Sequence, residues 1–381
     1  MRKRIVTVLG TRPEVIKLAP VLRELRAHPE AFESVLVSTG QHREMVDQAL
    51  SGFGLGIDVQ LDAMTAAHSL GSLTGRLFTD LDAVLAETRP DWVLVQGDTT
   101  SAMVGAMCAF YRRVRVGHVE AGLRTHDRWS PFPEEVNRTM ISRVADLHFA
   151  PTVRASENLV SEGVSAGSVH VTGNTVVDAL LWISGQLGSE APLEIGTDLL
   201  RAIEGMRLLL VTSHRRESFG KGLEDICQAV LELVRAHPDV VVVYPVHLNP
   251  NVRVPVRKLL GGCERIYLVD PLGYEALVYL LKRSYCVLTD SGGIQEEAPS
   301  FGKPVVIMRE TTERAEVIDA GCGCLTGTGT ANIVGAVSRL LNEPDRYRQM
   351  AGASNPFGDG KAAGRIIELL ATSGSLEPRP L

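Results

Sequence analysis

The chain has 381 residues, of which 45% are hydrophobic and 22% are charged, close to the average of globular proteins. This composition argues against a disordered, collagen-like or coiled-coil chain, and the length predicts about two domains. Asp and Glu number 45 against 39 for Lys and Arg, so the formal net charge is −6. Because the basic surface typical of nucleic-acid-binding proteins is lacking, we expect no nucleic-acid partner.

The longest apolar runs have the length of a strand, far below the roughly 20 residues that cross a bilayer. The apolar stretch after the basic start is also too short for a signal peptide. We therefore expect a cytoplasmic protein with no membrane partner. The six cysteines are too sparse for a disulfide framework and lack zinc-ligand spacing, so we expect no metal site.

Short β-branched runs alternate with longer amphipathic stretches along nearly the whole chain. In the first half, the pattern predicts strands over residues 5–9, 35–39, 92–96, 114–119 and 147–150, and helices over 15–26 and 102–111. In the second half, it predicts strands over 208–212, 240–246, 266–269, 286–289 and 305–307, and helices over 223–236, 275–282 and 294–300. This alternation predicts an α/β fold with two Rossmann-like, doubly wound parallel-sheet domains.

The turn-forming segment Val171-Thr172-Gly173-Asn174-Thr175 predicts a hinge between the two domains. We expect an N-terminal domain over residues 1–173, a C-terminal domain over 174–360, and a helix and tail over 361–381 that can pack back on the N-terminal domain. Two such domains would face a central cleft. Since parallel sheets bind ligands at the carboxyl ends of their strands, functional residues should directly follow the predicted strands.

The first strand is followed by Gly10-Thr11-Arg12-Pro13-Glu14 and then by Lys17. A glycine turn before an early proline builds a helix N-terminus, and Arg12 and Lys17 would add positive charge, so an anion site is one interpretation. An ordinary turn with two solvated cations explains this motif equally well. The sequence G-x-x-x-x-G-K-[ST] is absent from the chain, so the motif is not a P-loop.

Three carboxyl groups follow successive elements of the first half: Asp98, Glu120 and Glu134. Helix capping explains Asp98 on its own, and a place in the first turn of a helix explains Glu134. Glu120 lies in a small apolar context that capping explains less well, and burial there would raise its pKa. Three acids on three loops indicate acid/base chemistry at a carbon centre, where one group removes a proton and another returns it.

The second half carries groups suited to a nucleoside diphosphate. His214 follows a strand beside two arginines and is a plausible diphosphate partner, with a solvated loop as the alternative. The segment Ser291-Gly292-Gly293 opens a predicted helix, where backbone amides can approach phosphate oxygens. Glu297 could accept the hydroxyls of a ribose, and Arg314 adds a further cation.

Together these motifs resemble the bacterial non-hydrolysing UDP-N-acetylglucosamine 2-epimerase family, which has the two-domain GT-B architecture. The similarity extends in order over nearly the whole chain. The matching segments are residues 10–14, 40–44, 96–99, 118–124, 133–138, 214–217, 245–250, 288–300, 302–304, 311–314 and 355–360.

The resemblance implies an isomerase of nucleotide sugars that supplies cell-surface polysaccharide precursors. It assigns catalytic roles to Asp98, Glu120, Glu134 and His214. It also assigns substrate contacts to Arg12, Lys17, Arg138, Ser291, Gly292, Gly293, Glu297 and Arg314, with the acids in the first domain and UDP bound by the second. It further implies a homodimer that binds a UDP-sugar and UDP and uses no cofactor.

The resemblance also implies a possible regulatory site for UDP-N-acetylglucosamine at Gln41 and His42. Many relatives carry an Arg-Gln pair nearby, where this chain has Ala67 and His68. A regulatory site that makes fewer contacts with its ligand is coupled less strongly to the catalytic site, so we expect weak regulation by UDP-N-acetylglucosamine.

The reaction implied is inversion at carbon 2 of the sugar, giving UDP-N-acetylmannosamine through loss of UDP, a 2-acetamidoglucal and re-addition of UDP. Several alternatives stay open. The chain could be a hydrolysing epimerase that releases UDP and N-acetylmannosamine, or an epimerase of a related UDP-diacetamido sugar. A GT-B glycosyltransferase with a separate acceptor and a binding module without chemistry are more distant alternatives. Which carboxyl is the base and which is the acid also stays open.

Overall fold

The computed structural model describes residues 2–41, 43–63, 69–188 and 190–373. The contacts divide the chain into two compact units. Unit 1 comprises the chain up to Ala179 together with the segment from Phe357 onward, and unit 2 comprises Leu180–Pro356. These divisions lie a few residues from the domain limits expected at 173 and 360. None of the helices in the described ranges is long and apolar enough to cross a membrane.

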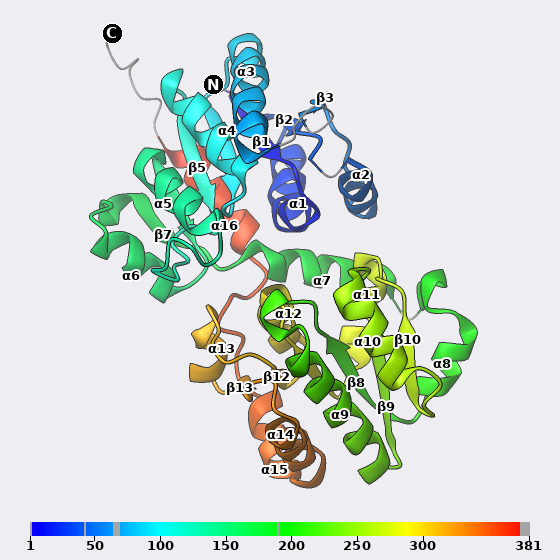
Figure 1. The fold of residues 1–381 in the computed structure, drawn as a ribbon. Helices are drawn as coiled ribbons and strands as arrows, with labels where there is room; N and C mark the ends of the chain where they lie inside the picture. Colours follow the sequence, from blue (N-terminus) through cyan, green and yellow to red (C-terminus); the bar gives the residue numbers. More distant parts are fainter. Residues whose placement is uncertain (1, 42, 64–68, 189, 374–381) are drawn as a thin grey trace. The chain divides into compact units, whose positions relative to one another are not determined.

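Unit 1 is built on a seven-stranded sheet with the order β3-β2-β1-β4-β5-β6-β7 (Figure 1). Each pair of neighbouring strands in this sheet is parallel. The strands are β1 (Lys3–Leu9), β2 (Phe32–Ser38), β3 (Val59–Gln60), β4 (Trp92–Gln96), β5 (Arg115–Val119), β6 (Leu147–Ala150) and β7 (Val169–Val171). Their carboxyl ends therefore lie along one edge of the sheet, where the loops that follow them meet.

Helices cover both faces of this sheet, because side chains of a strand alternate between its faces. Ile5 and Leu9 of β1 join one hydrophobic core, while Val6 and Val8 join the other. The helices are α1 (Arg12–Ala27), α2 (Arg43–Gly52), α3 (Leu70–Thr88), α4 (Thr100–Tyr111), α5 (Glu134–Val144), α6 (Val153–Ser161), the start of α7 (Thr175–Leu187), and α16 (Ala362–Thr372).

The helix α16, red in Figure 1, is the C-terminal contribution to unit 1. Its buried residues Ile366 and Leu370 belong to the same core as Leu18 and Leu22 of α1. The side chain of Lys3 donates to the backbone oxygens of Leu370, Ala371 and Ser373 at 2.6–2.8 Å. The first strand of the chain is thus bound to its last helix.

Unit 2 repeats the architecture on a six-stranded parallel sheet with the order β10-β9-β8-β11-β12-β13. Its strands are β8 (Arg207–Thr212), β9 (Val240–Pro245), β10 (Ile266–Val269), β11 (Cys286–Thr289), β12 (Val305–Ile307) and β13 (Gly323–Leu325). Its helices are α8 (Thr197–Ile203), α9 (Lys221–Ala236), α10 (Pro250–Leu260), α11 (Tyr274–Arg283), α12 (Gly292–Glu297), α13 (Ala315–Asp319), α14 (Thr330–Asn342) and α15 (Pro344–Ala351). The predicted fold class, two doubly wound parallel-sheet domains, is confirmed.

Every strand predicted from the sequence is present, with ends shifted by a few residues. Strands β3, β7 and β13 are additional; they have only two or three residues, too few for a periodic signal. The helix predicted over 294–300 is wrong in its second half. There α12 ends at Glu297 and a 3₁₀ turn over Ala298–Phe301 follows, with Pro299 at its start, where no backbone N–H is needed.

Candidate functional site

Glu120 lies directly after β5 and is the most constrained of the predicted site residues. Its φ of +61° is in the left-handed region, which residues other than glycine rarely adopt. The buried carboxylate forms an ion pair with Lys17 of α1 and accepts hydrogen bonds from the side-chain amides of Gln96 and Asn174. Elements far apart in the sequence thus hold one carboxylate in place.

Asp98 follows β4 and is partly buried. Its Oδ2 accepts a hydrogen bond from Nη2 of Arg138 at 2.6 Å, and its backbone oxygen accepts one from Asn137 at 2.9 Å. Burial raises the pKa of Asp98, the charge of Arg138 opposes this, and the charges of Glu120 and Glu134 raise it further. A carboxyl group whose pKa is raised is suited to carrying a proton in catalysis.

Glu134 is the first residue of α5 and is half-buried. Its charge acts on Asp98, as does that of Glu120, so unit 1 brings the three predicted acids into one electrostatic neighbourhood. A negative charge in the first turn of a helix also interacts favourably with the helix dipole, so Glu134 has a purely structural explanation as well.

Glu135 is a site-supporting residue that our sequence interpretation did not assign. The buried carboxylate accepts hydrogen bonds from the backbone amides of Thr125 and His126 at 2.9–3.1 Å. It also pairs with Nη1 of Arg138 at 3.2 Å, so Arg138 links Glu135 to Asp98. The i,i+3 spacing of Glu135 and Arg138 on a predicted helix was the signal that could have revealed this pair.

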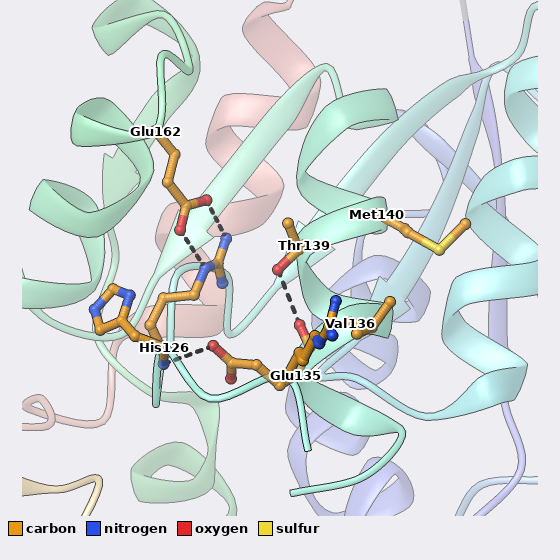
Figure 2. Close-up of a pocket in the computed structure, with 8 residues that line it drawn as sticks. His126, Glu135, Val136, Thr139, Met140 and Glu162 are labelled. Carbon is orange, nitrogen blue, oxygen red and sulfur yellow. Dashed lines mark hydrogen bonds and ion pairs between the residues drawn. The ribbon is translucent and has the colours of Figure 1, made fainter. Parts of the chain in front are cut away.

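Figure 2 shows Glu135 at the wall of a pocket of about 330 Å³ in unit 1. Beside it, Glu162 accepts two hydrogen bonds from the guanidinium of Arg124, at 2.7 and 2.9 Å. This fork occupies the buried Arg124, so Arg124 and Glu162 hold the end of α6 against the loop after β5. The lining residues are Arg124, His126, Arg128, Glu135, Val136, Thr139, Met140 and Glu162.

The predicted anion site at the start of α1 has a carboxylate of the chain in its centre. Glu14 is buried and accepts hydrogen bonds from the amides of Gly10 and Thr11 and from the hydroxyls of Thr11 and Thr99, at 2.7–3.0 Å. Burial raises the pKa of Glu14. These amides are therefore used within the protein, Lys17 is paired with Glu120, and Arg12 is half-buried as the first residue of α1.

Gln41, predicted for the regulatory site, lies beside the start of α4. Its Oε1 accepts a hydrogen bond from Ser101, whose hydroxyl is 3.0 Å from that of Thr39. A Cβ at Gly10 would collide with both hydroxyls, so only glycine fits there. His42, Ala67 and His68 lie outside the described residues, and the regulatory site stays a prediction.

In unit 2, His214 lies just after β8, held by Asp290 at the end of β11. Oδ2 of Asp290 accepts hydrogen bonds from Ser213 and from the amides of His214 and Arg215, at 2.8–2.9 Å. Nδ1 of His214 lies 3.3 Å from Oδ1 of Asp290, and its ring stacks on His247. Burial alone would raise the pKa of Asp290, but His214 and the two amides hold it below its ordinary value.

Ser291, Gly292 and Gly293 follow Asp290 and open α12, as predicted. The guanidinium of Arg314 lies against Gly292, where an added Cβ would approach its Cζ to 2.8 Å. Nε of Arg314 donates to Glu296 at 2.9 Å. The structure thus brings Arg314 to the start of α12, and the absence of a side chain at Gly292 makes this approach possible.

Glu297, predicted to bind a ribose, is buried near the end of α12. Its Oε1 accepts a hydrogen bond from the hydroxyl of Tyr274 at 2.7 Å. Tyr274 begins α11, and no sequence pattern indicates this pairing, because α11 meets this region through its packing on the 3₁₀ turn that follows α12.

Comparisons with known proteins agree with the motifs. The family model described as UDP-N-acetylglucosamine 2-epimerase matches residues 23–371. UDP-N-acetylglucosamine 2-epimerases of Yersinia pestis and Escherichia coli K12 are 49% and 48% identical, with 96% of this chain and 98% of each relative covered. The structure of UDP-GlcNAc 2-epimerase from Neisseria meningitidis bound to UDP-GlcNAc superposes with a TM-score of 0.88 at 43% identity, covering 96% of this chain and 99% of that one. The chain therefore belongs to the UDP-N-acetylglucosamine 2-epimerase family.

Proposed function

We propose that this protein is a non-hydrolysing epimerase that interconverts UDP-N-acetylglucosamine and UDP-N-acetylmannosamine. The family membership supports the substrate and the inversion at carbon 2. The observation that carries the proposal is a pair of neighbouring carboxyl groups in unit 1. Glu120 is paired with Lys17 and Asp98 with Arg138, yet burial still raises the pKa of Asp98. A carboxyl group with a raised pKa beside an ion-paired carboxylate is typical of an acid/base pair.

The proton on carbon 2 of the sugar is not acidic, so its direct removal is costly. Loss of UDP from carbon 1 together with this proton gives a 2-acetamidoglucal. UDP then re-adds at carbon 1 while a proton arrives on the other face of carbon 2. We assign the base to the carboxylate of Glu120 and the acid to Asp98, with Glu134 as a third member of the set. No oxidation or reduction occurs, and atoms and charges balance without a cofactor.

The groups in unit 2 are suited to holding UDP while it is detached. The contact of Nδ1 of His214 with Asp290 leaves Nε2 of this half-exposed side chain for a phosphate oxygen. We assign the remaining substrate contacts to the predicted residues Arg12, Lys17, Arg138, Ser291, Gly292, Gly293, Glu297 and Arg314. Firm retention of UDP favours re-addition over release, which is the difference between epimerisation and hydrolysis.

The decisive experiment follows pure protein and UDP-N-acetylglucosamine by NMR, recording both sugar anomeric signals and free UDP. A non-hydrolysing epimerase gives a stable mixture of two UDP-sugars with little free UDP. A hydrolysing epimerase instead accumulates UDP and N-acetylmannosamine in equal amounts, and a glycosyltransferase shows no turnover until an acceptor is added. A related UDP-diacetamido sugar, tested in parallel, decides between the two substrates by the ratio of kcat/KM.

We also propose that the protein is a homodimer, on the strength of the resemblance to its family. Sedimentation equilibrium measures the mass directly. A single species of about the 41.2 kDa chain mass would contradict the proposal.

A further inference from the structure

Asn174 lies at the point where the chain is about to leave unit 1, between β7 and α7. Its side chain is buried, and it makes contacts in two directions. Nδ2 donates to Oε1 of Glu120 at 3.0 Å, and Oδ1 accepts from the amide of Val176 in the first turn of α7 at 3.1 Å. The orientation of the amide group is therefore set by its own helix, and the donor is aimed at the carboxylate.

The same residue is bound to the segment by which the chain returns to unit 1. Its backbone amide donates to the oxygen of Phe357 at 2.6 Å. Gly173 and Gly358 pack against each other so closely that a Cβ at Gly173 would lie 3.3 Å from Cα of Gly358. Both glycines have a positive φ, of +89° and +137°. The outgoing and the returning segment are thus joined directly beside Glu120.

The donors to Glu120 differ in where they are anchored. Lys17 and Gln96 belong to α1 and β4, which are packed into the body of unit 1. Asn174 belongs to the linking segments. Lys17 and Asn174 share Oε1, while Gln96 binds Oε2. The Lys17 ammonium is a compact charge on a flexible stem, so it constrains the rotation of a carboxylate less than a fixed amide does.

We propose that Asn174 is a positioning residue for Glu120, whose amide holds the carboxylate in the orientation for proton transfer and ties that orientation to the two linking segments. The inference rests on the proposed function, because it assigns a task to Asn174 only if Glu120 transfers a proton. Asn174 itself takes no part in the chemistry.

The first variant to test is N174A, which removes the donor. Because a misplacement of about 1 Å can cost about 10²-fold in rate, we expect kcat to fall by about 10- to 100-fold. The KM for UDP-N-acetylglucosamine and the affinity for UDP should stay close to wild type, since Asn174 holds Glu120 and not the nucleotide.

The second variant, N174D, keeps the shape of the side chain and the acceptor for the amide of Val176, so it preserves the contact that orients this side chain on α7. It replaces the donor to Glu120 by a second negative charge. The titratable groups whose interaction with Glu120 is described are Lys17 of α1, Asp98 after β4 and His118 of β5. A like charge disfavours the ionised form of Glu120, so the acid limb of the kcat profile should move to higher pH.

The matched control is D178N. Asp178 also joins the outgoing to the returning segment, by accepting hydrogen bonds from the amides of Ala362 and Ala363 at 2.8–3.2 Å, but no described contact joins it to Glu120. We expect D178N to keep the wild-type kcat and pH profile. The inference is overturned if N174D has both a normal kcat and a normal profile, or if D178N reproduces the effects of the Asn174 variants. Absence of epimerase activity in the wild type would instead reject the proposed function.

Discussion

Lys17 forms a buried ion pair with Glu120, joining α1 to the end of β5. Both side chains have lost most of their contact with water. Each charge therefore depends on the opposite charge of its partner to offset the cost of losing its hydration. The pair stands at the centre of the candidate site, so the same contact bears on stability and on activity.

Replacing Lys17 with methionine should leave the buried Glu120 carboxylate without its cation. Removal of one member of a buried pair typically costs about 3–5 kcal/mol, and we expect a loss of this order in the free energy of unfolding of unit 1. Urea denaturation measures this loss. In the E120Q background the same K17M change should cost much less, because the charge that needed Lys17 is gone. Additive costs in the double-mutant cycle would contradict the pairing.

The amide variants D98N and E120Q preserve shape and remove the titratable proton. If both residues transfer protons, each variant should lose about 10²–10⁴ in turnover while still binding UDP, as measured by calorimetry. In deuterated buffer, the wild-type product should carry deuterium at carbon 2, because the returning proton comes from a group that exchanges with water. Product that retains the original hydrogen would exclude the elimination mechanism, and a variant with near-normal turnover would remove that residue from the set.

Replacing Glu135 with glutamine should move the pH profile without removing any proposed catalytic group. Glu135 shares Arg138 with Asp98, so its charge offsets part of the positive charge beside Asp98. In E135Q more of that charge acts on Asp98, which favours its ionised form and lowers its raised pKa. If Asp98 acts in its protonated form, the alkaline limb of the rate profile moves to lower pH.

Glu162 provides the control for this prediction. It lines the same pocket as Glu135 in Figure 2, but pairs with Arg124 instead of Arg138. E162Q should therefore leave the pH profile of the reaction in place. Equal shifts in E135Q and E162Q would show that general disturbance of the loop, and not the charge on Arg138, is responsible.

Two neutral histidines buried in unit 1, His118 and His148, should each contribute a loss of stability in mild acid. Burial lowers their pKa values, to about 3 for His118 and about 4 for His148, from about 6.5 in the unfolded chain. Their contribution is complete above pH ~6.5 and is lost as the pH falls towards the folded values, because only the unfolded state takes up the protons. The slope is about 1.4 kcal/mol per pH unit for each histidine. Urea titrations between pH 7 and pH 4.5 measure how the free energy of unfolding depends on pH. This dependence should be weaker in H148Q than in the wild type, because one of the two histidines is gone.

Much of the fold could be predicted from the sequence because its signals are local. Runs such as residues 208–212 and 286–289 are apolar and β-branched, and both form central strands of unit 2. The positions of Asp98, Glu120 and His214 follow from the rule that functional groups occupy the ends of parallel strands. The part that escaped prediction depends on partners distant in the sequence. Asn174 looked only like a turn former, and Glu135 only like a residue of a first helical turn.

The amides of Gly10 and Thr11 illustrate a second limit, which does not depend on distance along the sequence. A glycine turn before a helix shows that backbone donors are present, but not which acceptor they bind. In the structure Glu14 binds them, through a short-range contact that a ligand could equally have made. Sequence patterns thus identify donors and acceptors more readily than they identify pairs.

The packing of α16 into unit 1 determines the order in which the two units can fold during translation. A ribosome releases the strands and helices of unit 1 first, yet the core that contains Leu18 and Leu22 also needs Ile366 and Leu370. Unit 2, which is continuous in sequence, can complete its own core while α16 is still being made. Unit 1 must therefore wait, with the part of this core that α16 covers still exposed, until α16 has left the ribosome, and during that interval it is the half of the nascent chain most in need of a chaperone.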